Sequence, residues 1–223
     1  MTTNSKPKIV LLSLERQPWM DEMYGALFTA LRDKADVTEI TTPEEADDLF
    51  LTSTNKPNII IATDASLTNA KFRKQQDAAV TYVRSHGGTL LLACLFSSFA
   101  PPPDIKTFFA ALGLAWESGD YHRTEFSLNT SNTSVPNSAK ALLATRYSQK
   151  ALHLQHMATR DALYLPTASS FIQSRVFGPG PVGDRRQTPA ALGRCGMGWV
   201  GYVGDVNGEV ETEGVVLAMC GLL

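Results

Sequence analysis

The chain has 223 residues, of which 43% are hydrophobic and 19% are charged, and its formal net charge is -2 at pH 7. This composition is typical of a globular protein and excludes a disordered chain. Acidic and basic residues are spread along the sequence, whereas nucleic-acid surfaces and polybasic membrane patches need concentrated positive charge. We therefore expect no nucleic-acid partner, no membrane partner and a single domain over residues 1–223.

The N-terminal segment and the cysteines indicate a cytoplasmic location. Residues 1–8 are polar, and the apolar run after them is too short for a signal peptide. The longest apolar stretch, at 90–100, is far below the roughly 20 residues of a membrane helix. Cys94, Cys195 and Cys220 are too widely spaced for a disulfide framework or a CxxC zinc pattern.

Three nearly continuous apolar runs in the first half predict buried strands. They are IVLLSL (9–14), NIIIAT (58–63) and TLLLAC (89–94), and a shorter strand is expected over 36–40. Apolar residues on both faces are typical of parallel strands that helices cover on two sides. We expect the three long runs to be neighbours that point in the same direction.

Helices of crossover length are predicted between these strands. Pro18 suits the first position of the first helix, a short acidic helix is expected over 43–51, and a longer helix over 69–86 ends at Gly87 and Gly88. The apolar faces are predicted to contain Met20, Met23, Tyr24, Leu27, Phe28 and Leu31 in the first helix, and Phe72, Ala79, Val80 and Val83 in the long one.

The second half is less regular. A helix is expected over 104–112, short antiparallel strands between 121 and 177, the last of them over 171–177, a further strand over 199–203 and a buried helix over 211–222. The predicted fold class is α/β, with a doubly wound, mostly parallel sheet, helices on both faces and added antiparallel strands in the second half.

Two segments resemble a known superfamily. YVRSHGGTLLLAC (82–94) is similar to the helix, double glycine and strand that lead to the active-site turn of class I glutamine amidotransferase-like proteins, especially the trehalose-utilisation (ThuA-like) branch. GMGWVGYVGDVNGE (196–209) resembles the late strand and turn of the same fold. The resemblance implies a flavodoxin-like α/β fold and places Cys94 where these enzymes hold a nucleophilic cysteine on a strained elbow.

The chain departs from the superfamily pattern around that cysteine. Leu92 and Phe96 stand where small residues are usual, and the next helix is expected only after the prolines at 101–103. Bulky neighbours make a strained elbow sterically unfavourable. The polar residues near the final strand are Asp205, Asn207 and Glu209, without a histidine to match the family's later histidine and glutamate. We therefore expect no glutaminase activity.

The carboxyl ends of the parallel strands predict a polar crevice. The candidates there are Glu15, Arg16, Asp64, Ser66, Cys94, Asp205, Asn207 and Glu209. Such residues can bind a small polar ligand, hold a metal through oxygen atoms, exchange protons, or cap turns and helices. Turn chemistry around Asp64 and Asp205 favours capping, and we expect neither a metal nor a cofactor.

His122 and Arg123 form a second candidate pair, in a predicted strand. The arginine disfavours a charged imidazole, so that His122 could act as a neutral base or ligand. Because neighbouring strand residues point to opposite faces, at most one of the two should face a given pocket. His153 and His156 would share a face only on a helix, and the strand predicted there excludes a metal pair.

Three functions remain open. The first is a glutamine amidotransferase-like protein without glutaminase activity that binds a small polar ligand or a partner at the carboxyl edge. The second is a hydrolase or transferase that uses Cys94 on an amide, ester or glycosidic substrate. The third is a non-catalytic interaction module, such as a homodimer, in which Cys94 is a buried core residue.

Overall fold

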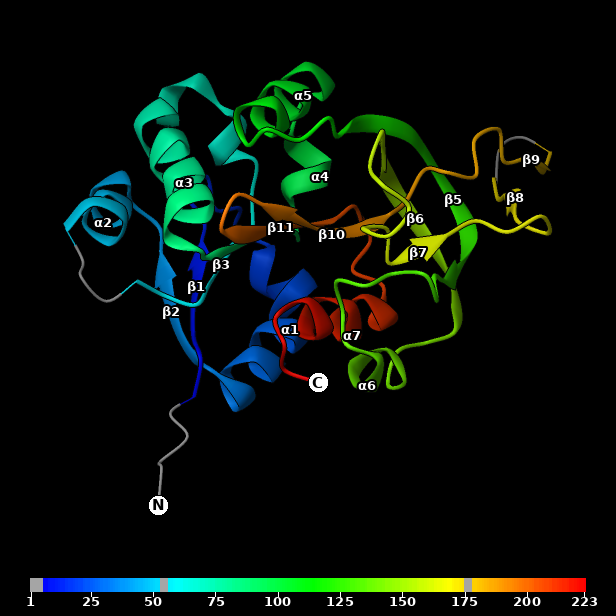
Figure 1. Ribbon diagram of the computed structural model, residues 1–223, viewed down its shortest axis with the longest axis horizontal. Coiled ribbons are helices and arrows are strands. Elements are labelled where there is room, and N and C mark those ends of the chain that lie inside the picture. The colour runs from blue at the N-terminus through cyan, green and yellow to red at the C-terminus, as the bar shows by residue number, and fades with distance from the viewer. Residues whose placement is uncertain (1–5, 53–55, 175–177) are drawn as a thin grey trace.

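The computed structural model describes residues 6–52, 56–174 and 178–223 and has an α/β fold (Figure 1). Its main sheet has six strands in the order β10-β11-β4-β3-β1-β2. The strands are β1 (Lys8–Leu12), β2 (Asp36–Ile40), β3 (Ile59–Ala62), β4 (Thr89–Leu92), β10 (Ala190–Cys195) and β11 (Gly198–Val203). All neighbouring pairs are parallel except β10 and β11. The predicted parallel arrangement of β1, β3 and β4 is thus confirmed.

Strand β10 was not predicted from the sequence. Its residues AALGRC are mostly small and have low strand propensity. Pairing with β11 nevertheless holds them in the sheet, and Cys195 is the last residue of this strand.

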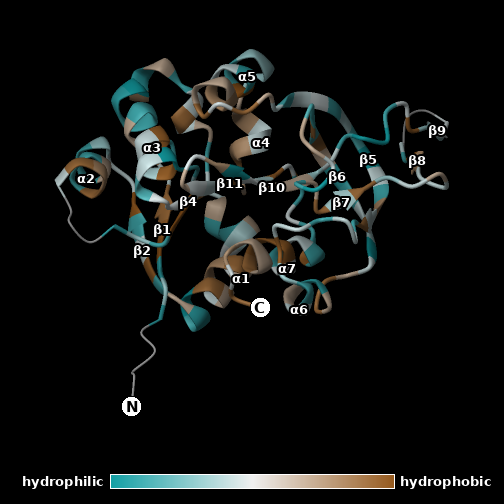
Figure 2. Ribbon diagram, in the orientation of Figure 1, coloured by the Kyte–Doolittle hydropathy of each residue, from teal (hydrophilic) through white to brown (hydrophobic). Residues whose placement is uncertain are grey.

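Helices cover both faces of the main sheet. Helices α1 (Met20–Lys34) and α7 (Val210–Met219) pack on one face, and α2 (Pro43–Asp47), α3 (Arg73–His86) and α5 (Pro102–Ala111) pack on the other. A hydrophobic core lies on each face of the sheet, and the side chains of β1 alternate between them. Ile9 and Leu11 point to one face, and Val10 and Leu12 point to the other. Figure 2 shows the resulting hydrophobic interior along the central strands and α7.

Short helical segments complete the first half and the connections. They are η1, a π-helical turn (Asp48–Thr52); η2 (Ser66–Thr68) and η3 (Ala70–Phe72), which are 3-10 turns; and the α-helical turns α4 (Phe96–Phe99) and α6 (Asn137–Lys140). Gly87 ends α3 with φ 75°, a left-handed conformation that glycine adopts easily. No helix within the described ranges is long and apolar enough to cross a membrane.

The predicted apolar face of α1 is confirmed except at one position. The helix begins at Met20, with Pro18 in the preceding turn. Met20, Tyr24, Leu27, Phe28 and Leu31 are buried, whereas Met23 is 37% exposed. Met23 lies beside the turn at Gly208 that leads into α7, so the two helices do not close over it. In α3, Val80 is only partly buried.

The second half adds two antiparallel sheets, as predicted. One has the order β6-β5-β7, and the other pairs β8 with β9. Their bounds are β5 (Glu117–Leu128), β6 (Arg146–Gln155), β7 (Tyr164–Leu165), β8 (Phe171–Ile172) and β9 (Gly180–Pro181). The strand predicted over 171–177 is found only at β8, and its residues 175–177 lie outside the described part of the chain.

Candidate functional site

Cys94 lies on a strained turn between β4 and a helix. Its φ is 56°, which is unusual for a residue other than glycine, and α4 begins two residues later at Phe96. The expectation that bulky neighbours make such an elbow sterically unfavourable, and that the next helix begins only after the prolines, was therefore wrong. Leu92 and Phe96 avoid the turn because they pack into the core on the opposite face from Cys94, where the Phe96 ring meets the edge of Tyr202.

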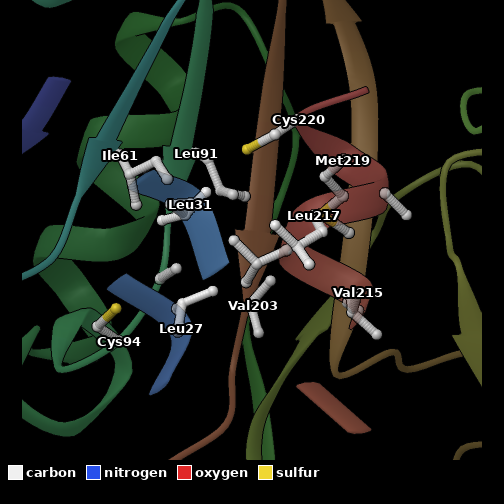
Figure 3. Close-up of a cluster of buried hydrophobic side chains, with 14 of the residues drawn as sticks. Leu27, Leu31, Ile61, Leu91, Cys94, Val203, Val215, Leu217, Met219 and Cys220 are labelled. Atoms are coloured by element: carbon white, nitrogen blue, oxygen red, sulfur yellow. The ribbon is translucent and has the colours of Figure 1, made fainter. Parts of the chain in front are cut away.

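The environment of Cys94 keeps its thiol protonated. The side chain is 4% exposed and belongs to the core beneath α1 and α7 (Figure 3). Burial raises the pKa of Cys94 most, the charge of Asp205 raises it further, and Arg16 only partly opposes them. A reactive cysteine instead needs a lowered pKa and access to solvent. Cys94 thus has the strained backbone of a nucleophilic elbow, but it lacks the lowered pKa and the solvent access of a reactive thiol.

Asp64 holds the turns that follow β1 and β3. Its Oδ2 accepts a hydrogen bond from the backbone N–H of Glu15 at 2.7 Å, and its Oδ1 accepts from the N–H of Ser66 at 3.0 Å. The Glu15 carboxylate accepts from Asn69 at 3.2 Å, and Arg16 pairs with Asp21 at 2.6 Å. These residues meet at the carboxyl edge as predicted, and their hydrogen bonds give them turn-forming roles.

Asp205 is the corresponding residue after β11. It is 2% exposed. One oxygen accepts from the N–H groups of Asn207 and Gly208, and the other accepts from the N–H of Glu209 at 2.7 Å and the hydroxyl of Thr212 at 2.6 Å. Four donors therefore satisfy this carboxylate, which holds the turn that leads into α7.

Glu209 and Arg123 connect the carboxyl edge to the second sheet. The Arg123 guanidinium donates to Glu209 Oε1 in a partly buried ion pair and also approaches the Ser148 hydroxyl at 3.4 Å. The amide of Asn207 donates to the same Glu209 oxygen at 3.4 Å. Glu209, together with Asn207, thus faces Arg123 on β5.

A cleft of about 1130 Å³ opens beside this ion pair. We call it the polar cleft; its polar walls include Tyr121, His122, Arg123, Lys150, Gln173 and Asn207. Both His122 and Arg123 line it, so the prediction that at most one would face a given pocket was wrong. β7 pairs with β5 only at Ser127 and Leu128, and beside the cleft the same edge of β5 is bridged at Arg123 by Gln173, which also lines the cleft.

His122 forms the inner wall of the polar cleft with His153 behind it. The two rings meet edge to face with centroids 4.4 Å apart, and the buried Nε2 atoms of both have no hydrogen-bond partner in the described part of the chain. Desolvation lowers the pKa of His122, with the charge of Asp120 acting in the opposite direction. Burial, helped by His122, lowers the pKa of His153 to about 3. Both rings are neutral at pH 7.

The other histidine of the predicted strand, His156, lies elsewhere. It follows the end of β6 in a left-handed conformation with φ 64°, and its Nδ1 contacts Glu117 at 2.8 Å. His153 and His156 therefore diverge, as the strand prediction requires.

Sequence reasoning missed Lys150, Gln173 and Tyr24. Lys150 lies in β6, and its ammonium lies 5.1 Å from the Tyr121 ring centre. Its polar neighbours Ser148 and Gln149 gave no signal that singled it out. Tyr24 was assigned to an apolar helix face, although its hydroxyl is a polar group that needs a partner when buried. No local pattern marks Gln173.

Comparisons with known proteins bear on the fold. No protein-family model matches the chain, and no curated protein matches it. A ThuA-like protein from Bacteroides uniformis superposes with a TM-score of 0.59 at 9% identity, covering 99% of this chain and 92% of that one. A ThuA-like protein from Parabacteroides merdae gives a TM-score of 0.52 at 11% identity, with 98% and 92% covered.

A β-galactosidase from Bacillus circulans sp. alkalophilus also superposes, with a TM-score of 0.57 and 12% identity. The match covers 97% of this chain but 31% of that enzyme, so the chain spans about a third of its length. At these identities the likeness shows the fold, which is the one found in solved ThuA-like proteins.

Proposed function

We propose that this chain is a cytoplasmic, single-domain, ThuA-like member of the glutamine amidotransferase-like superfamily that lacks glutaminase activity and binds a small polar ligand in the polar cleft. The observation that carries the proposal is a cleft of about 1130 Å³ whose described lining brings together His122, Lys150 and Gln173. These side chains carry polar groups of the kind that hydrogen-bond to ligand hydroxyls.

The charges of the polar cleft support a ligand with hydroxyl groups and a negative charge. Lys150 and Arg123 supply cations, whereas the described lining residues include no carboxylate. Arg123 is already paired with Glu209, which leaves Lys150 as the principal partner for an anion. The Tyr121 ring is 55% exposed and offers an apolar surface to the ligand's carbon skeleton.

Titration calorimetry with glucose, glucuronate and glucose 6-phosphate tests this proposal. We expect Lys150→Gln to weaken binding of the two anions about tenfold and to leave glucose within about twofold. His122→Phe keeps the ring contact with His153 and should weaken binding of all three. Lys34→Gln, at an exposed site on α1, is the control. Absence of binding, or binding that neither cleft variant changes, would overturn the proposal.

The strained elbow favours one alternative, a cysteine-dependent hydrolase or transferase. Such an enzyme would need Cys94 to react rapidly and selectively with iodoacetamide at pH 7. Because the Cys94 thiol is buried, we expect its alkylation to be no faster than the unfolding of the protein. We also expect no release of ammonia from glutamine. Rapid native-state alkylation, or glutamine hydrolysis that is lost in Cys94→Ser, would favour the enzyme instead.

A further inference from the structure

A second cavity, of about 130 Å³, lies between α1 and α7 at the level of Cys94. We call it the α1–α7 cavity. Leu27, Val203 and Val216 give it apolar walls, and the Cys94 side chain also lines it. Figure 3 shows Leu27, Val203 and Cys94 within the hydrophobic cluster that surrounds this space. It is separate from the polar cleft, since the two have no lining residue in common.

One polar group in this cavity is left unsatisfied. Tyr24 is 6% exposed, and its hydroxyl has no hydrogen-bond partner among the described residues. Two carboxylates of the wall are engaged, because Asp205 accepts from four donors, one of them the Thr212 hydroxyl, and Glu209 pairs with Arg123. A third carboxylate of the wall, Glu213, is half-buried. A buried phenol normally finds a partner, so its isolation here points to an absent acceptor.

The size and charge of the cavity restrict what can fill it. A dry apolar cavity of roughly 150 Å³ accommodates a benzene ring, so this one suits a molecule of about six to eight non-hydrogen atoms. Asp205, Glu209 and Glu213 lie in the wall, and their carboxylates repel an anion. The apolar walls disfavour any charged group. The occupant should be neutral, largely apolar and able to accept one hydrogen bond.

The cavity has a route to solvent between the two helices. Met23 and Val210, which both line it, are 37% and 86% exposed. Ala26 also belongs to the lining and lies on the exposed side of α1. A small molecule can therefore enter along the first turns of α1 and α7.

We propose that the α1–α7 cavity binds a small neutral amphiphile, such as a phenol, an alcohol or an amide, whose oxygen accepts a hydrogen bond from the Tyr24 hydroxyl while its apolar part contacts Leu27, Val203 and Val216. This site does not depend on the ligand proposed for the polar cleft.

Phenol and toluene are matched probes, because they have the same number of non-hydrogen atoms and differ in the hydroxyl group. We expect calorimetry to give a Kd for phenol on the order of 0.1–1 mM and a preference for phenol over toluene of about fivefold, the effect of one hydrogen bond. Benzoate, the charged probe, should not bind in the cavity.

Two variants locate the binding. Tyr24→Phe should bind phenol and toluene with equal affinity, and its affinity for toluene should match that of the wild type. Ala26→Leu should weaken the affinity for both probes tenfold or more, because the larger side chain fills the entrance. Ala110→Leu, at an exposed position of α5 on the opposite face, is the matched control.

Nuclear Overhauser effects from phenol to the methyl groups of Leu27, Val203 and Val216 provide a second measurement that does not depend on variant stability. The proposal is overturned if phenol does not bind, if Tyr24→Phe keeps the phenol preference, or if these methyl groups show no contact with the ligand.

Discussion

Arg123 and Glu209, which are 86 positions apart in the sequence, form an ion pair at the junction between the two halves of the fold. Arg123 lines the polar cleft, and Glu209 lines the α1–α7 cavity. The side chains are 29% and 21% exposed. The pair therefore ties β5 to the start of α7 and forms the partition between the two candidate ligand sites.

Breaking this pair should destabilise the protein more than breaking a surface pair. We expect a double-mutant cycle with Arg123→Met and Glu209→Gln to give a coupling of roughly 1 kcal/mol in the free energy of unfolding by urea. The same cycle at Arg73 and Asp77, whose side chains are 64% and 63% exposed, should give a smaller coupling. Equal couplings at the two sites would mean that partial burial does not strengthen the Arg123 pair.

Asp205 should be the carboxylate of the carboxyl edge whose loss costs most stability. In Asp205→Asn an NH₂ group replaces one of the two acceptor oxygens. This group then faces either the Glu209 N–H and the Thr212 hydroxyl, or the N–H groups of Asn207 and Gly208, and cannot accept from them. We expect a loss of about 2–4 kcal/mol in unfolding free energy. Asp33→Asn, at an exposed end of α1, is the control. A loss below about 0.5 kcal/mol would contradict the role of Asp205 in holding this turn.

The parts of the fold that short-range patterns determine could be predicted. The runs that became β1, β3 and β4 are apolar on both faces, and this feature alone indicates parallel strands between helices. Parallel strands bring their carboxyl ends together, so the proximity of Asp64, Cys94 and Asp205 followed from the topology.

The polar cleft could not be predicted in the same way, because its contacts join distant segments. The edge-to-face contact between His122 and His153 depends on the register between β5 and β6, and no local pattern encodes a strand register. The error at the elbow had another cause. The prediction assumed a regular strand, in which residues two positions apart share a face, whereas the left-handed backbone at Cys94 turns its side chain into the core opposite to that of Leu92 and Phe96.

The buried His153 should make the protein sensitive to mild acid. An unfolded histidine titrates near 6.5, whereas burial lowers the folded pKa of His153 to about 3. Between these two pKa values the unfolded chain binds the proton and the folded protein does not. The free energy of unfolding is therefore highest above pH 6.5 and decreases as the pH falls from 6.5 toward 3. The expected loss is about 2 kcal/mol between pH 7 and pH 5, with a further contribution from His122, whose pKa is also lowered.

Urea unfolding at both pH values measures this effect. His153→Leu should remove most of the loss, because the unfolded state of the variant no longer gains that proton. His86→Leu, at an exposed position at the end of α3, should retain it. If His153→Leu is as acid-sensitive as the wild type, other groups cause the acid response.

The left-handed backbone at Cys94 predicts an unusual order of substitutions. With φ at 56°, a residue that carries a Cβ is strained by roughly 1–2 kcal/mol, whereas glycine is not. Cys94→Gly and Cys94→Ala both remove the buried sulfur, so the difference between them isolates the backbone. We expect the glycine variant to be the more stable by about 1 kcal/mol in urea unfolding. At Leu91, inside β4, the alanine variant should be more stable than the glycine variant. If the alanine variant were also the more stable at position 94, the elbow would not be strained.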